Sequence, residues 1–223
     1  MVKIVYLVRR KSGMGVEEFR SYWWTVHGPI AAKMPGLRKY IQSHTNLSGY
    51  RNGEPVWDGI AEIWFDDEKA VSRAVESPEG RATAADTAKF LDLSISDSIL
   101  TVEHIQKDGP TDTPYVKFIS FIRRKAGMDP QAFRSYWWDQ HGPLVTKLPG
   151  LRRYLQSHVP LSAYQDGAEP RYDGVAELWF DSTDAIRATG ESVIGQSVFA
   201  DERNFIEDSG TRLFLLCSER LVA

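Results

Sequence analysis

The sequence predicts an α+β fold in which two tandem βαββαβ modules form one barrel within a single chain. Three observations lead to this prediction: the chain repeats itself, each copy has the same order of strand and helix patterns, and each copy leaves one face of its sheet uncovered. The repeat is plainest where FRSYWWTVHGP, beginning at Phe19, returns as FRSYWWDQHGP from Phe133. In the same way KMPGLRKYIQSH returns as KLPGLRRYLQSH, and WDGIAEIWFDD returns as YDGVAELWFDS.

The composition is that of an ordinary globular protein. Of the 223 residues, 42% are hydrophobic and 26% are charged, and the formal net charge is -3. So small a charge provides no strong attraction for nucleic acid or anionic lipid, and no apolar run is long enough to span a bilayer. The opening MVKIVYLVRRKSG places its apolar run before its basic cluster, the reverse of a secretory signal, so we expect a cytoplasmic protein without nucleic-acid or membrane partners. The single cysteine, Cys217, excludes an intrachain disulfide and is expected to be a small buried side chain.

The repeat divides the chain into a first module at residues 1–107 and a second at residues 115–223. The linker, residues 108–114, lies in the stretch KDGPTDTP, whose residue types are typical of loops. The copies stay in register except that GAEP has one residue more than GEP, in a turn-like stretch where an insertion is tolerated.

Each copy begins with a strand and an amphipathic helix. VKIVYLVRR and YVKFISFIRR are dense in the β-branched and aromatic residues that favour strands. In the segment that follows, one side of a helix is marked by Phe19, Trp23, His27, Ile30 and Met34.

Start and stop signals bound this helix. In the second copy Asp129 and Pro130 are a good N-cap and first-turn pair, where the first copy has the weaker pair Met-Gly. The Gly-Pro that follows His27 is expected to kink or restart the helix, and a later Pro-Gly ends it.

Two more strands, a second helical region and a closing strand complete each copy. GLRKYIQSHT and WDGIAEIWF have strand patterns, residues 68–91 have a helical pattern with an acidic start, and the copies close with SILTVEHIQ and TRLFLLCSERL. The resulting βαββαβ order is that of ferredoxin-like modules. A four-stranded sheet with both helices on one face leaves the other face bare, so the two modules are expected to pair as an intrachain pseudo-dimeric α+β barrel. A further homodimer of the whole chain is left open.

The copies agree most closely from the first helix to the second strand, and this stretch holds most of the histidines. Four of the five histidines form matched pairs, His27 with His141 and His44 with His158. A buried histidine needs partners for its ring nitrogens, so core packing explains repeated histidines less well than it explains the repeated tryptophans.

Polar side chains line one face of the second strand. Strand alternation places Tyr40, Gln42 and His44 together. The second copy repeats them as Tyr154, Gln156 and His158. On the third strand Glu62, and Glu177 at the same place in the second copy, lies among apolar neighbours, where a carboxylate is expected to be paired or to have a perturbed pKa.

Two arrangements of this polar face are open. If it lines the space between the modules, His27 lies behind the sheet and cannot join it. If it faces the helices, His27 at the kinked end of its helix converges with it. We favour the second arrangement, which predicts one pocket in each module between helices and sheet.

The segments RKxGMxxxxFRSYWWxxHGP, PGLRxYxQSH and YDGxAELWFD resemble the EthD-like family of the dimeric α+β barrel superfamily, here as two fused modules. The resemblance covers most of both copies, and relatives in the family include lactone isomerases, polyketide cyclases and proteins of unassigned role. Lactone isomerases of the family are understood to use a histidine where His27 stands and a tyrosine where Tyr40 stands. The resemblance therefore supports a catalytic role for both residues.

The leading hypothesis is a cofactor-independent acid/base enzyme of isomerase, cyclase or lyase/dehydratase type, acting on a small apolar or aromatic carbonyl, lactone or polyketide-like substrate. In it, His27 or His44 removes a proton next to a carbonyl. The other histidine, or Tyr40, donates a hydrogen bond to the developing enolate. We expect no cofactor and no metal.

Other side chains are expected to support this chemistry. Gln42 helps to fix the carbonyl, Glu62 orients a histidine, and Trp23 and Trp64 exclude water. The second module is expected to use the same set: His141, Tyr154 and His158 as catalytic residues, and Gln156, Glu177, Trp137 and Trp179 as binding residues. Two aspartates, each four residues before a phenylalanine, are secondary candidates, although a solvated helical position is the simpler expectation for them: Asp86 and Asp201.

Other readings stay open. The protein is alternatively a hydrophobic-ligand-binding or accessory protein of an oxidative catabolic pathway, or a heme- or quinone-type monooxygenase on the same scaffold. A metal site would need His27, His44 and Glu62 to converge as two histidines and one carboxylate. The copies also differ near the expected site, for example at Asn46 and Trp57, so that catalysis by one module and a structural role for the other is a further alternative.

Overall fold

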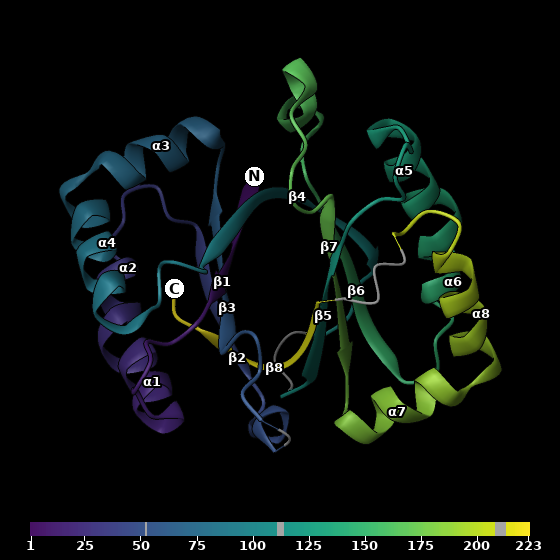
Figure 1. The fold of residues 1–223 in the computed structure, drawn as a ribbon, viewed down its shortest axis with the longest axis horizontal. Helices are drawn as coiled ribbons and strands as arrows, with labels where there is room; N and C mark the ends of the chain where they lie inside the picture. The colour runs from purple at the N-terminus through teal and green to yellow at the C-terminus, as the bar shows by residue number, and fades with distance from the viewer. Residues whose placement is uncertain (52, 111–113, 208–212) are drawn as a thin grey trace. The chain divides into compact units, whose positions relative to one another are not determined.

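The computed structural model describes residues 1–51, 53–110, 114–207 and 213–223. The first copy contains β1 (Val2–Val8), α1 (Val16–Tyr22), η1 (Trp23–His27), α2 (Gly28–Ala31), β2 (Lys39–Thr45), η2 (Leu47–Tyr50), β3 (Gly59–Phe65), α3 (Glu68–Glu76), α4 (Pro78–Phe90) and β4 (Asp97–Lys107). The second contains β5 (Val116–Ile122), α5 (Pro130–Tyr136), η3 (Trp137–His141), α6 (Gly142–Val145), β6 (Leu151–His158), η4 (Leu161–Gly167), β7 (Gly174–Phe180), α7 (Thr183–Glu191), α8 (Val193–Glu202) and β8 (Phe214–Leu221). Figure 1 shows both sets, and their order confirms the predicted βαββαβ repeat.

The sheet has the topology that the sequence predicts. Among the described residues, eight strands follow the closed order β1-β3-β2-β8-β5-β7-β6-β4. Within each copy the third strand pairs antiparallel with the first and second strands, β3 with β1 and β2 and β7 with β5 and β6. The fold is therefore the predicted intrachain α+β barrel of two ferredoxin-like modules.

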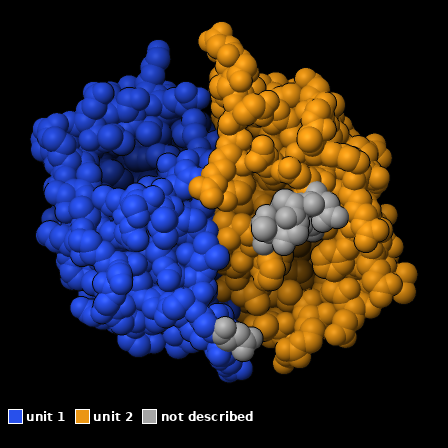
Figure 2. Space-filling view, in the orientation of Figure 1, with its two compact units in different colours: residues 1–100, 217–223 blue, residues 101–216 orange. Residues whose placement is uncertain are grey.

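The compact units of the structure end at different residues from the sequence repeats. Unit 1 comprises residues 1–100 and 217–223, and unit 2 comprises residues 101–216 (Figure 2). The reason is that each closing strand pairs with the other copy: β4 pairs with β6 from Val102 to Lys107, and β8 pairs with β2 from Cys217 to Leu221. The predicted linker at residues 108–114 lies partly outside the described residues, as does the start of the predicted closing strand at residue 211.

Capping explains where several helices begin. The carboxylate of Asp129 accepts a hydrogen bond of 2.9 Å from the backbone N–H of Ala132, and Pro130 opens α5, which confirms the predicted N-cap. The helical region expected over residues 68–91 is instead two helices. Ser77 ends α3 and caps α4, its hydroxyl accepting 2.9 Å from the N–H of Gly80, and Pro78 then begins the new helix.

The first helix does not break at its Gly-Pro. Instead the chain stays helical through a π-helical turn, η1, in which the N–H of Gly28 donates to the carbonyl of Trp23, and then continues into α2. Pro29 has no N–H to donate, and it lies in the first turn of α2, where a helical N–H partner is not required. η3 repeats the same turn before Pro143. Single π-turns are frequent at functional sites.

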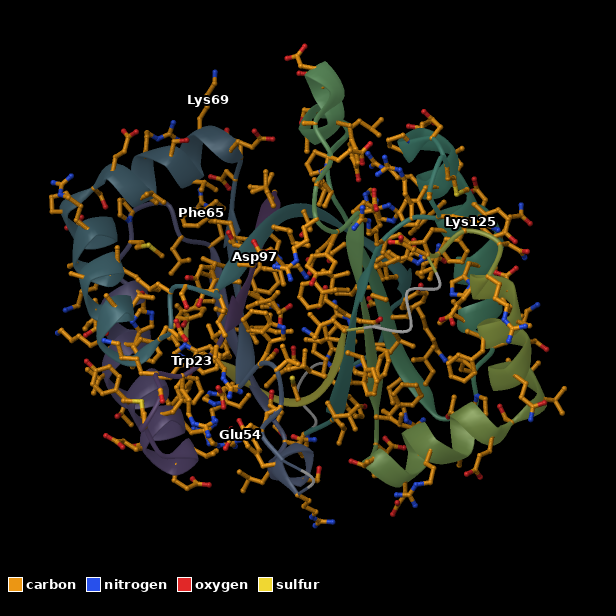
Figure 3. The ribbon with its side chains drawn as sticks, viewed as in Figure 1. Trp23, Glu54, Phe65, Lys69, Asp97 and Lys125 are labelled. Atoms are coloured by element: carbon orange, nitrogen blue, oxygen red, sulfur yellow. The ribbon has the colours of Figure 1, made fainter. Side chains whose placement is uncertain are left out.

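The first helix packs on the sheet through a tryptophan that lies against a glycine. Trp23 of η1 lies between the helices and the sheet of unit 1 (Figure 3). A Cβ placed on Gly59 would lie 2.7 Å from the Trp23 ring, and a Cβ on Gly174 would lie 2.6 Å from the Trp137 ring. The repeated Asp-Gly of the third strands therefore provides the space for the repeated tryptophan. In the part of the chain that the structure describes, no helix is long and apolar enough to cross a membrane.

Candidate active site

In unit 1, the polar face of β2 points toward the helices, as we favoured from the sequence. The phenol oxygen of Tyr40 accepts hydrogen bonds from the indole N–H of Trp23 at 3.0 Å and from the amide Nε2 of Gln42 at 3.2 Å. The same Nε2 donates 2.8 Å to the carbonyl of Trp23 in the π-turn. The Oε1 of Gln42 lies 3.1 Å from Nε2 of His44. All of these side chains are buried.

Unit 2 repeats this network. The phenol oxygen of Tyr154 accepts from the indole of Trp137 at 3.1 Å and from Nε2 of Gln156 at 3.0 Å, and Oε1 of Gln156 lies 2.9 Å from Nε2 of His158. Nε2 of Gln156 also donates 2.9 Å to the carbonyl of Trp137. The two copies therefore hold the same five-group arrangement between helix, π-turn and strand.

The network fixes what the tyrosine and the strand histidine can do. Both amide hydrogens of Gln156 are used, so its Oε1 is the acceptor and His158 donates from Nε2. The neutral His158 therefore carries its lone pair on Nδ1. The oxygen of Tyr154 already accepts two hydrogen bonds, so the hydrogen-bonding capacity it retains is that of a donor.

Burial holds these groups in their neutral forms. It raises the pKa of Tyr40 to about 12 and also raises the pKa of Tyr154. It lowers the pKa of His44 to about 3, with Arg20 and Arg220 lowering it further. The pKa of His158 is likewise lowered to about 3, by burial first and then by nearby His104 and Arg134. At neutral pH each network is therefore uncharged, with a phenol that donates.

The helix histidine has an aspartate partner. Nδ1 of His27 lies 2.9 Å from a carboxylate oxygen of Asp86, whose other oxygen accepts 2.8 Å from the hydroxyl of Tyr22 and 3.1 Å from Lys89. Asp86 is only 2% exposed, so the solvated position expected for it is wrong. Burial alone would raise the pKa of Asp86, but its hydrogen bonds from Tyr22, His27 and Lys89 together lower it. Burial lowers the pKa of His27, and Asp86 offsets part of that effect.

This pairing defines the basic atom of the histidine. A neutral His27 donates Nδ1–H to the ionised Asp86, which leaves the lone pair on Nε2. In unit 2, Nδ1 of His141 lies 2.8 Å from one carboxylate oxygen of Asp201, whose other oxygen accepts a hydrogen bond of 2.7 Å from the hydroxyl of Tyr136. Each module therefore presents a histidine held by a carboxylate, the arrangement of a general base.

Unit 2 encloses an apolar cavity of about 390 Å³ that is lined by a histidine and a tyrosine, both of which were predicted to be catalytic. His141 and Tyr154 both line it, together with Trp137. The rest of the wall is mostly apolar and includes Phe118, Phe121, Leu178, Ile186, Val198 and Phe199. A cavity of this size with few polar groups suits a small apolar ligand.

The first module has a larger side chain at one position of this wall. Ser120 on β5 lines the cavity of unit 2, where the first copy has Tyr6. Tyr6 packs against the core cluster that contains Trp23. The two modules thus have the same polar network, but they differ in the size of a side chain next to it, where a ligand would lie.

Some predicted site residues lie elsewhere. Glu62 and Trp64 lie on the sheet face opposite the helices, because they alternate with Ala61, which packs in the helix-side core. Glu62 accepts 2.8 Å from the hydroxyl of Ser43 and lies 3.4 Å from Nζ of Lys3. The second module has equivalent contacts. Glu177 accepts a hydrogen bond from the hydroxyl of Ser157 and forms an ion pair with Lys117, and Lys117 also lies over the ring of Trp179.

The predicted contact of this carboxylate with a histidine is therefore replaced by contacts with lysine and serine. His27, His44 and Glu62 do not converge as a metal site, because Glu62 is on the other face of the sheet. Among the described residues, no group of three or more histidine, cysteine, aspartate or glutamate side chains has a metal-binding arrangement. Gln156 and His158 also lie outside the lining of the apolar cavity, so Gln156 acts on the site through Tyr154.

Sequence reasoning missed the cavity wall. Ser120, Gly190, Phe199 and Glu202 all line it, but three of them come from the second helical region, where the copies agree least. The available signal was a size difference between the copies, serine at position 120 against tyrosine at position 6. The aspartate partner had a signal as well, since Asp201 recurs at Asp86 within that dissimilar region.

Comparison with known proteins identifies the family. The family model for the EthD domain matches residues 11–94 and again residues 125–209. An uncharacterized 11.0 kDa protein from the thcB-thcC intergenic region of Rhodococcus erythropolis is 31% identical over 86 residues, which cover 39% of this chain and 81% of that protein.

Several solved structures share the whole fold at low sequence identity. An anthrone oxidase-like protein has a TM-score of 0.65 at 12% identity, with 100% of this chain and 93% of that chain covered. A proposed monooxygenase from Fusobacterium nucleatum has a TM-score of 0.62 at 10% identity, with coverage of 99% and 93%. A mutant chlorite dismutase from Candidatus Nitrospira defluvii has a TM-score of 0.54 at 11% identity, with coverage of 97% and 91%. These likenesses extend to the fold alone. With its EthD domain matched twice, the chain belongs to the EthD family and carries two copies of that domain in tandem.

Proposed function

We propose that the second module is an acid/base enzyme that removes a proton next to the carbonyl of a small apolar ketone, lactone or polyketide-like substrate. The observation that carries this proposal is the shared cavity of His141 and Tyr154, one a carboxylate-held imidazole and the other a phenol poised to donate. The proton transfer itself uses only side chains of the chain.

The two residues have complementary roles. Asp201 accepts the Nδ1–H of His141, so Nε2 takes the substrate proton and the aspartate stabilises the imidazolium that forms. Negative charge then develops on the substrate oxygen. Tyr154, held by Trp137 and Gln156, donates its O–H to that oxygen without losing its own proton, because burial raises the pKa of the phenol.

Returning the proton at another carbon gives isomerisation. Loss of a β-hydroxyl from the same enolate gives dehydration, and attack of the enolate on a second carbonyl gives cyclisation. All three outcomes begin with one deprotonation, so the site supports the isomerase, lyase and cyclase classes alike. The mostly apolar wall favours a substrate whose carbonyl is its main polar group.

An oxygenase that forms a quinone is the second candidate. An aromatic substrate with an acidic CH2 group would give a carbanion at the same base. Dioxygen would then oxidise this carbon to a carbonyl: one oxygen atom enters the product, and the other leaves as water with the second hydrogen of the CH2 group and the proton that the histidine took. The name of the anthrone oxidase-like structure, which shares the fold, points to such a substrate. The same cavity would also serve a protein that binds an apolar ligand without converting it.

Incubation of the protein with apolar ketones and lactones, followed by mass spectrometry of the products in H2O and D2O, separates these functions. Our proposal predicts an unchanged mass, or loss of water, in H2O and incorporation of deuterium in D2O. A product with an added oxygen atom would favour the oxygenase, and tight binding without a product would favour the ligand-binding protein.

Tyr154→Phe tests the role of the phenol in this assay. We expect it to lower kcat by about 10²- to 10³-fold because it removes the donor to the developing oxyanion. The matched variant in the first module, Tyr40→Phe, removes the same hydroxyl from the same network and is expected to leave the rate unchanged. Equal losses in both variants would contradict the assignment to the second module.

A further inference from the structure

A second, polar pocket of about 250 Å³ lies in unit 2, and it shares no lining residue with the apolar cavity. Two histidines from the sheet line it, His104 on β4 and His158 on β6. The helical side contributes Arg134, Ser135, Trp138 and Asp139. The His104 ring lies 5.0 Å from that of His158 and 5.7 Å from that of Trp138, centroid to centroid.

The pocket contains buried ring nitrogens without a hydrogen-bond partner among the described residues. Nδ1 of His158 and Nε2 of His104 are both in this position. His158 lines the pocket and is only 2% exposed, and its Nε2–H is used by Gln156, so Nδ1 is the ring nitrogen that is left as a lone-pair acceptor. A buried acceptor left without a donor costs free energy, which a ligand that carries a donor would recover.

Arg134 is a second group whose bonding capacity is unused. In the first module Arg20, at the same position, donates 2.9 Å to the backbone carbonyl of Thr45. The guanidinium of Arg134 makes no hydrogen bond or ion pair with any residue that the structure describes, although its charge acts on both histidines. An unpaired guanidinium beside a pocket favours an oxyanion, which accepts two parallel hydrogen bonds from it.

The two requirements together define the ligand. Arg134 needs an anionic oxygen, whereas Nδ1 of His158 needs a hydrogen-bond donor. We propose that this pocket binds an oxyanion that also carries a hydroxyl, which is the chemistry of a protonated phosphate group or of a hydroxy carboxylate. The anionic oxygens pair with Arg134, and the O–H donates to Nδ1 of His158. A metal cation fits less well, because the charge of Arg134 acts directly on both histidines.

The first module has different side chains at some of the positions that line this pocket. The strand pairing places His104 opposite Gln156, where Arg220 lies opposite Gln42 in the first module. The guanidinium of Arg220 lies over the Trp24 ring, at 5.5 Å from its centroid. The shorter His104 leaves room in the second module. Asp139, at the position of Thr25, is exposed at the rim and opposes an anion.

Titration of the isotope-labelled protein with inorganic phosphate, glycolate and acetate, followed by NMR of the histidine rings, tests the proposal. We expect saturable shifts of the His158 nitrogen signals with phosphate or glycolate. The anion that binds more tightly shows whether the natural ligand is a phosphate or a hydroxy carboxylate. Acetate has the charge but no hydroxyl at neutral pH, so we expect it to bind more weakly than glycolate.

Variants assign the contacts. Arg134→Gln is expected to weaken binding by about 10- to 100-fold, because it removes charge-assisted hydrogen bonds. Asp139→Asn is expected to tighten binding, because it removes a repelling charge. The matched variant Arg20→Gln in the first module is expected to leave the affinity unchanged. Near-ultraviolet circular dichroism shows whether Arg134→Gln folds. If it does not, Arg134→Lys replaces it: this variant keeps the positive charge but cannot donate two parallel hydrogen bonds, so we expect it to bind the anion more weakly than the wild type.

Three results would overturn the proposal: no saturable shift with phosphate or glycolate, acetate binding as tight as glycolate binding, or equal effects of Arg134→Gln and Arg20→Gln. Because the apolar cavity shares no lining residue with this pocket, these results leave the proposed proton transfer at His141 untouched.

Discussion

At the scale of single residues, the sequence indicated the histidine of each site, but it indicated the aspartate that holds it only as a secondary candidate. His27 was found because a polar ring interrupts an apolar helical stripe and recurs at His141. Asp86 lies in a region with few matches between the copies, and spacing alone cannot tell a solvated aspartate from one that is 2% exposed. Glu62 shows the opposite case, because its burial was expected correctly but its face of the sheet carries lysine and serine rather than a histidine.

The aspartate partner gives the first prediction at this scale. Asp201→Asn removes the charge that stabilises the imidazolium of His141, so we expect kcat to fall by between about 10²- and 10⁴-fold, with a smaller change in KM. Steady-state kinetics on any substrate found by product mass measures this. Asp86→Asn is the matched control in the first module. A kcat for Asp201→Asn within a factor of two or so of the wild type would show that His141 does not act as the base.

At the scale of elements, hydrophobic and polar periodicity predicted the order of strands and helices and placed the polar residues of β2 on one face. It left open which way that face points, and the orientation that we favoured is the one observed. Periodicity could not predict the π-turn η1, because the chain stays helical through it and only the register of the hydrogen bonds changes. Nor could it predict that residues 68–91 form two helices, since the separation depends on a cap at Ser77.

The contact between tryptophan and glycine gives the prediction for this scale. Gly174→Ala would bring a methyl group to 2.6 Å from the Trp137 ring and from the carbonyl oxygen of Ser157, so the strand or the ring must move. We expect the free energy of unfolding to fall by about 1 to 3 kcal/mol, as for overpacked cores. Urea denaturation measures it, and Gly15→Ala, whose added methyl meets nothing within 4 Å, is the control. Equal stabilities of the two variants would refute the close-packing account.

At the scale of the whole molecule, the repeat predicted the tandem α+β barrel but not how the closing strands are shared. The boundaries of the compact units cannot be read from a repeat when β4 and β8 each pair with a strand of the other copy. The sequence also indicated that the modules differ, at Asn46 and Trp57, yet the cavity differs at Ser120 and other positions of its wall. Wall residues are generic apolar or small types, so only their placement in space reveals them.

Acid sensitivity is the prediction for this scale. His44 and His158 have pKa values near 3 in the folded protein, against an ordinary value of 6.5, so the unfolded chain binds their protons first. The free energy of unfolding therefore falls as the pH drops from about 6.5 toward 3, with a slope of about 1.4 kcal/mol per pH unit for each of these histidines.

Urea unfolding across this pH range measures the slope in the wild type and in His44→Gln and His158→Gln. Each substitution removes one group that binds a proton in the unfolded chain but not in the folded protein. We therefore expect it to lower the slope of the unfolding free energy with pH by about 1.4 kcal/mol per pH unit, independently of its effect on stability at pH 7. Slopes that stay at the wild-type value in both variants would mean that neither histidine is held neutral by burial.

The central claim is that the second module carries the chemistry through His141 in its apolar cavity. The most direct test compares kcat/KM for His141→Ala and His27→Ala, two substitutions at matched positions of the repeat, on the same substrate. We predict a loss of at least about 10²-fold for His141→Ala, because the base is gone, and little change for His27→Ala. An unchanged kcat/KM for His141→Ala would contradict the claim, and so would an equal loss in both variants.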